Sequence, residues 1–228
     1  MPENSLQAWK IFDPSGKISF HLERFLSMRL DTPLDDLFLN RSHVRVLRAL
    51  HKLPEGFVAS GRELARRAGV THPTALKALS LLVNVGVVTA DRGLAGDAYD
   101  INRDHLLAVY VASLFQAEAA IGVELAAFLR ERLHALTDKV ESATLFGSAV
   151  WGESTPRSDV DIAVSCAPGN LEKVESALEK LAEAVQRRFG NQLSPLIDSG
   201  TRKRRPAIWK RIESEGAPLI RSGKPVIA

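Results

Sequence analysis

The chain has 228 residues, a length that suits one large domain or two small ones. Its hydrophobic content of 45% and charged content of 25% are ordinary for a soluble globular protein. The 30 basic residues against 27 acidic ones leave a net charge of +3, which is too small to indicate nucleic-acid binding by itself.

Three features of the sequence bear on where the protein works. A single cysteine, Cys166, excludes an internal disulfide bond and fits a reducing cytoplasm. The first residues lack a basic segment followed by an apolar run, so we expect no signal peptide. The most apolar stretch, residues 106–129, is interrupted by Gln116, Glu118 and Glu124. We therefore predict a cytoplasmic protein and expect no membrane segment.

Residues 1–40 are expected to form an N-terminal arm, and their pattern is weak. The segment DTPLDD, residues 31–36, is typical of a turn. We expect the arm to pack on the domain that follows it or on a second copy of the chain.

Helix signals become clear in residues 41–103, which we expect to form one domain. Ser42 is predicted to cap a first helix. Ser60 and Glu63 have the spacing of a capping box and predict a second helix. Thr71 is predicted to cap a third helix.

The third helix should bury Leu76, Leu79 and Leu82, which recur at helical spacing. Beyond it, residues 87–90 and 99–101 can pair as a β-hairpin around a glycine-containing tip. Two helices joined by a glycine turn and followed by a hairpin are typical of a winged helix-turn-helix domain.

The segment GRELARRAGVTHPTALKALSLLVNVGVV resembles the winged helix-turn-helix of bacterial MarR-type and ArsR-type regulators. The resemblance implies that the second helix of this motif enters the major groove of DNA. It assigns base contacts to Thr71, His72, Thr74 and Lys77, and phosphate contacts to Arg66, Arg67 and Arg92. Alternatively, the same fold would serve as a protein–protein or dimerisation module.

Residues 104–138 are predicted to form a long helix that connects two domains. Its apolar residues are too many to face water, so we expect them to be buried on the preceding domain or in a homodimer seam. They are Leu107, Tyr110, Val111, Leu114, Ile121, Leu125, Phe128 and Leu129.

Two neighbouring strands are predicted within residues 142–165, which read SATLFGSAVWGESTPRSDVDIAVS. The first breaks at Gly147 and Ser148, and the second carries Asp159 and Asp161 at its start. Because side chains alternate along a strand, the two carboxylates should share a face, about 6.5 Å apart along the chain. They repel each other unless a cation lies between them, and Mg²⁺ takes one or two carboxylates together with substrate phosphates. A D-x-D pair alone is otherwise typical of a solvated strand face.

The order of strand, Gly-Ser, turn, D-x-D and strand resembles the nucleotidyltransferase superfamily of DNA polymerase β, in particular its small bacterial members. The resemblance covers about residues 142–220. It implies that Asp159 and Asp161 hold Mg²⁺ and that Gly147 and Ser148 hold the phosphates of a nucleoside triphosphate (NTP). It further implies transfer of a nucleotidyl group to a hydroxyl acceptor, which the sequence does not identify.

The remaining chain should supply an amphipathic helix from Leu171 and a third strand at 193–197, where Pro195 indicates an edge position. In the resembling enzymes a third carboxylate comes from this strand. Ser194 aligns with it and is not such a ligand, so Asp198, four residues further on, is the candidate substitute. The basic cluster at 201–205 precedes a last helix and is a second candidate for phosphate contacts.

We therefore predict an α+β protein: a winged helix-turn-helix, a long helix, and a nucleotidyltransferase-like domain with a mixed sheet over residues 139–228. The expected function is that of a DNA-binding protein that transfers a nucleotidyl group with Mg²⁺. The alternative is a non-enzymatic transcriptional regulator whose C-terminal domain senses a nucleotide or binds a partner. Its two-part organisation also resembles that of toxin–antitoxin proteins, although nothing in the sequence identifies a cognate toxin.

Overall fold

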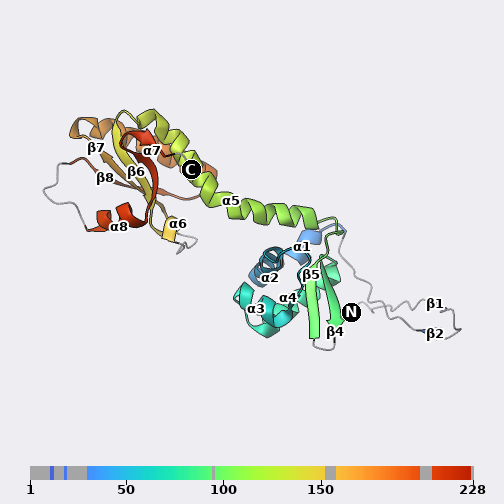
Figure 1. Ribbon diagram of the computed structural model, residues 1–228. Coiled ribbons are helices and arrows are strands. Elements are labelled where there is room, and N and C mark those ends of the chain that lie inside the picture. Colours follow the sequence, from blue (N-terminus) through green and yellow to red (C-terminus); the bar gives the residue numbers. More distant parts are fainter. Residues whose placement is uncertain are drawn as a thin grey trace. The chain divides into compact units, whose positions relative to one another are not determined.

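The computed structural model describes residues 30–93, 96–151, 158–200 and 207–226. It also describes the backbone of two short antiparallel strands, β1 (Ile11–Phe12) and β2 (Ile18–Ser19). The chain divides into two compact units, residues 1–117 and residues 118–228 (Figure 1). Helix α5 (Ala108–Leu133) begins in the first unit and ends in the second. The helix expected to connect two domains is therefore shared between them.

The first unit combines a group of helices with a small antiparallel sheet (Figure 1). Its helices are α1 (Pro33–Leu37), α2 (Arg41–His51), α3 (Gly61–Ala68) and α4 (His72–Val85). Its strands lie in the order β3 (Ala59–Ser60), β5 (Gly96–Ile101) and β4 (Val88–Gly93). The core of this unit includes the fully buried side chains Leu47, Leu64, Leu79 and Leu82.

Local capping residues set the boundaries of these helices. Ser60 accepts a hydrogen bond from the Glu63 amide (3.3 Å), and Thr71 accepts one from the Thr74 amide (3.4 Å), as predicted. The cap expected at Ser42 is wrong. Asn40 caps α2 instead, because its Oδ1 accepts from the Ser42 amide at 2.9 Å and from the next amide at 3.2 Å.

Three further expectations for this unit need correction. Residues 31–36 are not only a turn, since α1 begins at Pro33. Leu76 is 38% exposed rather than buried, because Ala75, Ala78, Leu79 and Leu82 form the inner face of α4. The hairpin strands reach further into the expected tip, where Asp91 pairs with Ala98.

The second unit is built on a five-stranded mixed sheet in the order β10-β9-β6-β7-β8. The strands are β6 (Val140–Phe146), β7 (Val160–Cys166), β8 (Leu193–Asp198), β9 (Ala217–Arg221) and β10 (Lys224–Pro225). Strands β7 and β8 are parallel, and the other pairs are antiparallel. The mixed sheet agrees with the expectation, and β8 lies at the edge as Pro195 indicated.

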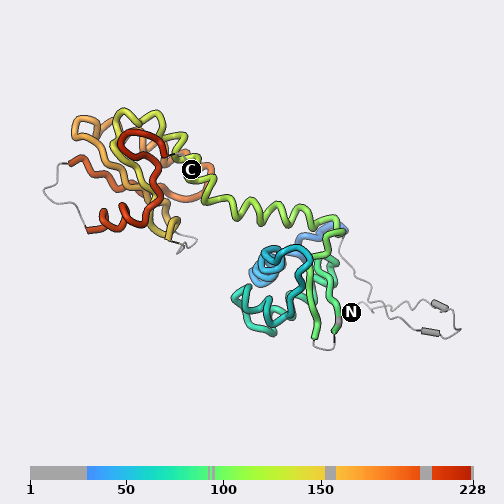
Figure 2. Tube along the Cα trace, viewed as in Figure 1, coloured from blue at the N-terminus to red at the C-terminus, as the bar shows by residue number. Residues whose placement is uncertain are grey.

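Helices cover both faces of this sheet (Figures 1 and 2). The end of α5 and α7 (Leu171–Phe189) pack on one face, and α8 (Ile208–Glu215) packs on the other. The described part of this unit also contains three short helices: η1 (His134–Leu136), α6 (Ser148–Trp151) and η2 (Pro168–Asn170). The predicted amphipathic helix is α7, which Gly190 ends in a left-handed conformation.

Helix α5 has an unusual distribution of apolar residues. Within the described residues one stretch, Ala108–Leu136, has the length and mean hydropathy (1.4) of a candidate membrane span. Its two ends are partly buried in the cores of the two units, through Val111 and Phe115 on one side and Leu129 on the other. Between and before these contacts Val109, Tyr110, Leu114, Ile121 and Val123 are exposed. The expected burial of its apolar face is therefore met only in part.

Candidate functional site

The centre of the candidate site is the junction of β6, Gly147 and β7. The two strands are antiparallel, and Phe146, the last residue of β6, pairs with Asp161. Gly147 follows with a φ of 74°, in the left-handed region that favours glycine. A Cβ atom placed on Gly147 would lie 2.9 Å from Cγ of Asp161 and closer still to its Oδ2. The glycine therefore gives the Asp161 carboxylate the space that it occupies.

Asp159 and Asp161 are electrostatically coupled. Partial burial raises the pKa of Asp161, and the negative charge of Asp159 raises it further. Asp159 itself is exposed, just before β7 begins. Two carboxylates that disfavour each other's charge attract a cation to the space between them. The structure thus places Asp161 against Gly147 and close enough to Asp159 for the two charges to interact.

Asp198 does not join this pair. In the parallel register of β7 and β8, Asp161 pairs with Ser194, whereas Asp198 pairs with Ser165. Four residues along a strand correspond to about 13 Å, which is too far for a shared ion. Asp198 is instead buried, and it accepts a hydrogen bond from the Gly200 amide at 3.1 Å. Within the described residues no three or more His, Cys, Asp and Glu side chains gather as a metal site would require.

Helix α6 begins at Ser148 and places Trp151 beside the sheet. The guanidinium of Arg211, on α8, lies 3.7 Å from the centroid of the Trp151 ring. Arg211 also pairs with Glu215 at 2.8 Å. This brings a positive charge next to the short helix, although Ala149, Val150 and Trp151, which follow Ser148 in that helix, are not basic. Sequence reasoning missed Arg211, because only the packing of α8 brings it to α6.

A pocket of about 320 Å³ adjoins Asp159. One wall comes from α5, and the sheet contributes Leu145 and Val160. Ala149 of α6, Ser158, Asp159 and Asn191 complete the lining. Nδ2 of Asn191 donates a hydrogen bond to the Ser158 carbonyl at 3.1 Å. The pocket lies wholly within the second unit.

The residues predicted to contact DNA bases are gathered at the start of α4. Thr71 is its cap, and the hydroxyls of Thr71 and Thr74 are hydrogen-bonded to each other at 2.8 Å. His72 and Lys77 are exposed on the same helix. Thr71 is also exposed, whereas Thr74 is half-buried.

Two of the residues predicted to contact phosphates form ion pairs with the same carboxylate, that of Glu63. Glu63 pairs with Arg66 at 2.7 Å and with Arg67 at 2.6 Å. Hydrogen bonds from Arg66 and then from Arg67 lower the pKa of Glu63 to about 2. The third predicted contact, Arg92, lies in β4, and its side chain is outside the described residues, as is the basic cluster at 201–205.

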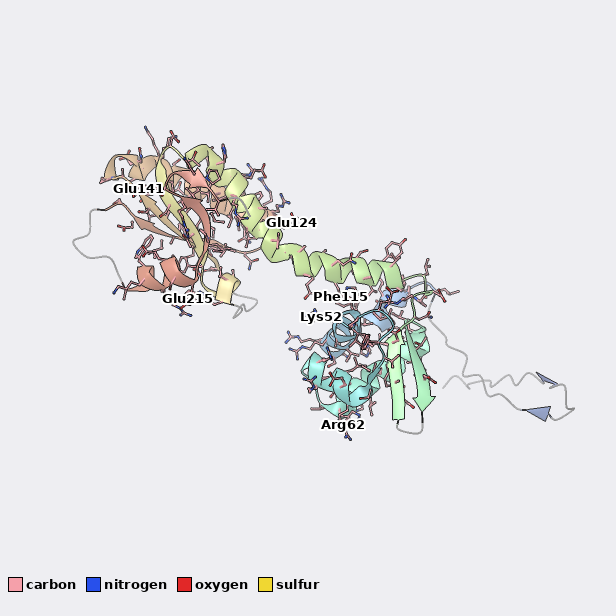
Figure 3. The ribbon with its side chains drawn as sticks, in the orientation of Figure 1. Lys52, Arg62, Phe115, Glu124, Glu141 and Glu215 are labelled. Atoms are coloured by element: carbon pink, nitrogen blue, oxygen red, sulfur yellow. The ribbon has the colours of Figure 1, made fainter. Side chains whose placement is uncertain are left out.

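A basic cleft between α2 and α3 was not predicted. It has a volume of about 490 Å³, and Lys52, directly after α2, is among its residues (Figure 3). The basic side chains that line it are Arg45 and Arg48 from α2, Lys52 directly after α2, and Arg66 and Arg67 from α3. The spacing of three and then four residues along α2 was the available signal for one basic face.

Comparison with known proteins supports the reading of the second unit. Residues 130–221 match a family model described as "Polymerase beta, Nucleotidyltransferase". The chain matches no curated protein and no solved structure at a significant level. The family match includes Gly147, Asp159 and Asp161, and it supports a nucleotidyl-transfer fold for this part of the chain.

Proposed function

We propose that the second unit binds an NTP together with one Mg²⁺ and transfers a nucleotidyl group to a hydroxyl acceptor. The observation that carries this proposal is the D-x-D pair, whose Asp161 packs against Gly147 inside the segment similar to polymerase-β nucleotidyltransferases. We further propose that the first unit binds DNA.

The donor set fits a single Mg²⁺. Asp159 and Asp161 offer oxygen ligands, and Mg²⁺ is commonly bound by one or two carboxylates together with substrate phosphates. When bound, the ion would neutralise phosphate charge and orient the NTP. Gly147 would let a phosphate approach the backbone, and Ser148 would orient it. A site for a second Mg²⁺ would need a third carboxylate, and the residue that pairs with Asp161 on β8 is Ser194.

The same serine favours a second candidate function. Two-metal phosphoryl transfer stabilises both the attacking and the leaving oxygen, and one ion cannot do both. A chain with two carboxylates could then bind an NTP and transfer its nucleotidyl group slowly or not at all. In that case the protein is a DNA-binding regulator that senses a nucleotide.

DNA binding is supported by exposed and basic side chains of the first unit. His72 and Lys77 are exposed on α4, and the cleft between α2 and α3 gathers five basic residues. Phosphate contacts of this kind make affinity depend steeply on salt. Binding of the protein to duplex DNA should therefore weaken as salt concentration rises.

Calorimetric titration with ATP, GTP, CTP and UTP, with and without Mg²⁺, tests the proposed nucleotide site. We expect Mg²⁺-dependent binding of at least one NTP by the wild type and its loss in the double variant Asp159→Ala, Asp161→Ala. Absence of NTP binding by the wild type would overturn the proposal. The variant Ser194→Asp then separates the two candidate functions. If the protein is a weak transferase, this variant should release pyrophosphate from the NTP faster than the wild type does. Pyrophosphate release by the wild type at ordinary enzymatic rates would refute the regulator.

A further inference from the structure

The cleft between α2 and α3 concentrates positive charge in a space of about 490 Å³ within the first unit. Five of the eight described residues that line it are basic, and none of the eight is acidic. The other three, Ala49, Ala68 and Gly69, are small, so the long basic side chains provide most of the lining. Like charges gathered in this way repel one another and favour an anion between them. The composition of the cleft therefore fits a ligand with several negative charges.

Two of the arginines are held in place by contacts within the first unit. Nη1 of Arg45 donates a hydrogen bond to the Gly69 carbonyl at 3.3 Å, which connects α2 to the turn after α3. The guanidinium of Arg48 lies over the Phe115 ring, 5.5 Å from its centroid. The bond from Arg45 uses one of the five N–H donors of its guanidinium, and guanidinium groups bind phosphate oxygens through paired N–H donors. The chemistry of these side chains therefore suits phosphate groups.

Glu63 already binds the two arginines on the α3 side of the cleft. Its Oε1 accepts hydrogen bonds from Nη2 of Arg66 at 2.7 Å and from Nε of Arg67 at 2.6 Å. Its Oε2 accepts another from Nε of Arg66 at 3.0 Å. Glu63 is not among the described lining residues, yet it bonds to two residues that are. A phosphate that approaches Arg66 and Arg67 from the cleft must share their donors with this carboxylate.

The cleft is distinct from the surface that carries His72 at the start of α4. It includes residues 66–69, at the end of α3, whereas His72 lines a second pocket together with Ser60 and Arg62, at the beginning of α3. Lys52, from the cleft, and Arg62, from the second pocket, lie apart in the first unit (Figure 3). Substitutions in the cleft therefore test a surface other than the one expected to contact DNA bases.

We propose that the cleft between α2 and α3 binds phosphate groups, and that Glu63 limits its affinity by competing for Arg66 and Arg67. The phosphates come either from a DNA backbone or from a free polyphosphate, and the inference rests on the proposed DNA binding only for the first of these sources. Removal of the Glu63 carboxylate should strengthen binding, because it releases N–H donors to the ligand. Removal of a cation from the cleft should weaken binding. The two substitutions thus have effects of opposite sign.

The proposal is tested with four single variants of the full chain: Glu63→Gln, Lys52→Ala and the controls Asp104→Asn and Arg103→Ala. Glutamine, like glutamate, is suited to the third position of a helix, and Lys52 lies directly after α2, so both folds should be kept. Asp104 and Arg103 are exposed residues of the same unit outside the described lining, and their variants remove the same charges. Binding of labelled duplex DNA is measured by fluorescence anisotropy, and binding of inorganic triphosphate by calorimetry. Both are measured without Mg²⁺, so that the proposed NTP site does not contribute.

We expect Glu63→Gln to tighten binding at least threefold and Lys52→Ala to weaken it at least threefold, with both controls within twofold of the wild type. Such changes in DNA binding would identify the DNA backbone as the source of the phosphates. The same changes in triphosphate binding alone would identify a free polyphosphate.

The inference is overturned if Glu63→Gln leaves the binding of both probes unchanged or weaker, if Lys52→Ala changes neither, or if the controls have equal effects. Unchanged DNA binding by the cleft variants, together with unchanged triphosphate binding, would refute the inference and leave the proposed DNA binding intact. A wild type that bound triphosphate but no DNA would instead refute the proposed DNA binding alone. A wild type that bound neither probe would overturn both.

Discussion

Replacing Gly147 with alanine tests the geometry at the centre of the site. The new methyl group would enter the space of the Asp161 carboxylate, whose Cγ lies 2.9 Å from the Cβ position. It would also place a side chain on a residue with a φ of 74°. The substitution therefore adds two separable costs, one from backbone conformation and one from crowding.

The two costs differ in whether they depend on Asp161. A left-handed alanine costs about 1–2 kcal/mol whatever its neighbours are. Crowding of a filled site typically adds about 1–3 kcal/mol. We expect Gly147→Ala to lower the free energy of unfolding by about 2–5 kcal/mol in the wild-type background. The Asp161→Ala background removes the carboxylate and keeps only the Cβ atom, 3.1 Å from the Cβ position on Gly147, so the backbone cost of about 1–2 kcal/mol should remain with a small part of the crowding.

A double-mutant cycle of the four proteins measures this difference. Urea unfolding can be followed by tryptophan fluorescence, since Trp151 and Trp209 both belong to the second unit. The expected coupling energy is about 1–3 kcal/mol. An equal cost of Gly147→Ala in both backgrounds would show that Asp161 is not crowded by this position, and the reasoning would be refuted.

Three further predictions concern single substitutions. Because burial and then Asp159 raise the pKa of Asp161, the folded protein loses stability as the pH rises through that pKa. Near neutral pH, Asp161→Asn should therefore have a larger free energy of unfolding in urea than the wild type, and this difference should shrink in acid. A difference that grows in acid would contradict the prediction. Thr71→Ala removes the cap of α4 and should cost about 1 kcal/mol in thermal unfolding of the first unit, whereas Thr71→Ser should cost much less. Lys77→Ala should weaken binding to duplex DNA and reduce its salt slope by about 1, measured by fluorescence anisotropy. Lys173→Ala, a control on the second unit, should leave DNA binding unchanged.

Local chemistry made several parts of this fold predictable from the sequence. The side chains of Ser60 and Thr71 accept hydrogen bonds from amides three residues further on, and the helices that they cap were predicted at the right positions. The pair Asp159 and Asp161 was equally local, because spacing along one strand determines its geometry. Gly147 could be predicted as a break, although its contact with Asp161 depends on the pairing of β6 with β7.

Features that depend on packing between distant segments could not be predicted in the same way. The register of β7 and β8 separates Asp198 from Asp161, and no local pattern specifies that register. Strand β9 was missed, because APLIR contains a proline and is recognisable only beside β6.

The central claim is that Asp159 and Asp161 hold one divalent cation together with an NTP. Titration with Mn²⁺, followed by electron paramagnetic resonance in the presence of the NTP that the wild type binds most tightly, counts this ion directly. We predict one NTP-dependent Mn²⁺ per wild-type chain and none in the double variant Asp159→Ala, Asp161→Ala. Two such ions in the wild type, or an ion that persists in the double variant, would contradict the claim.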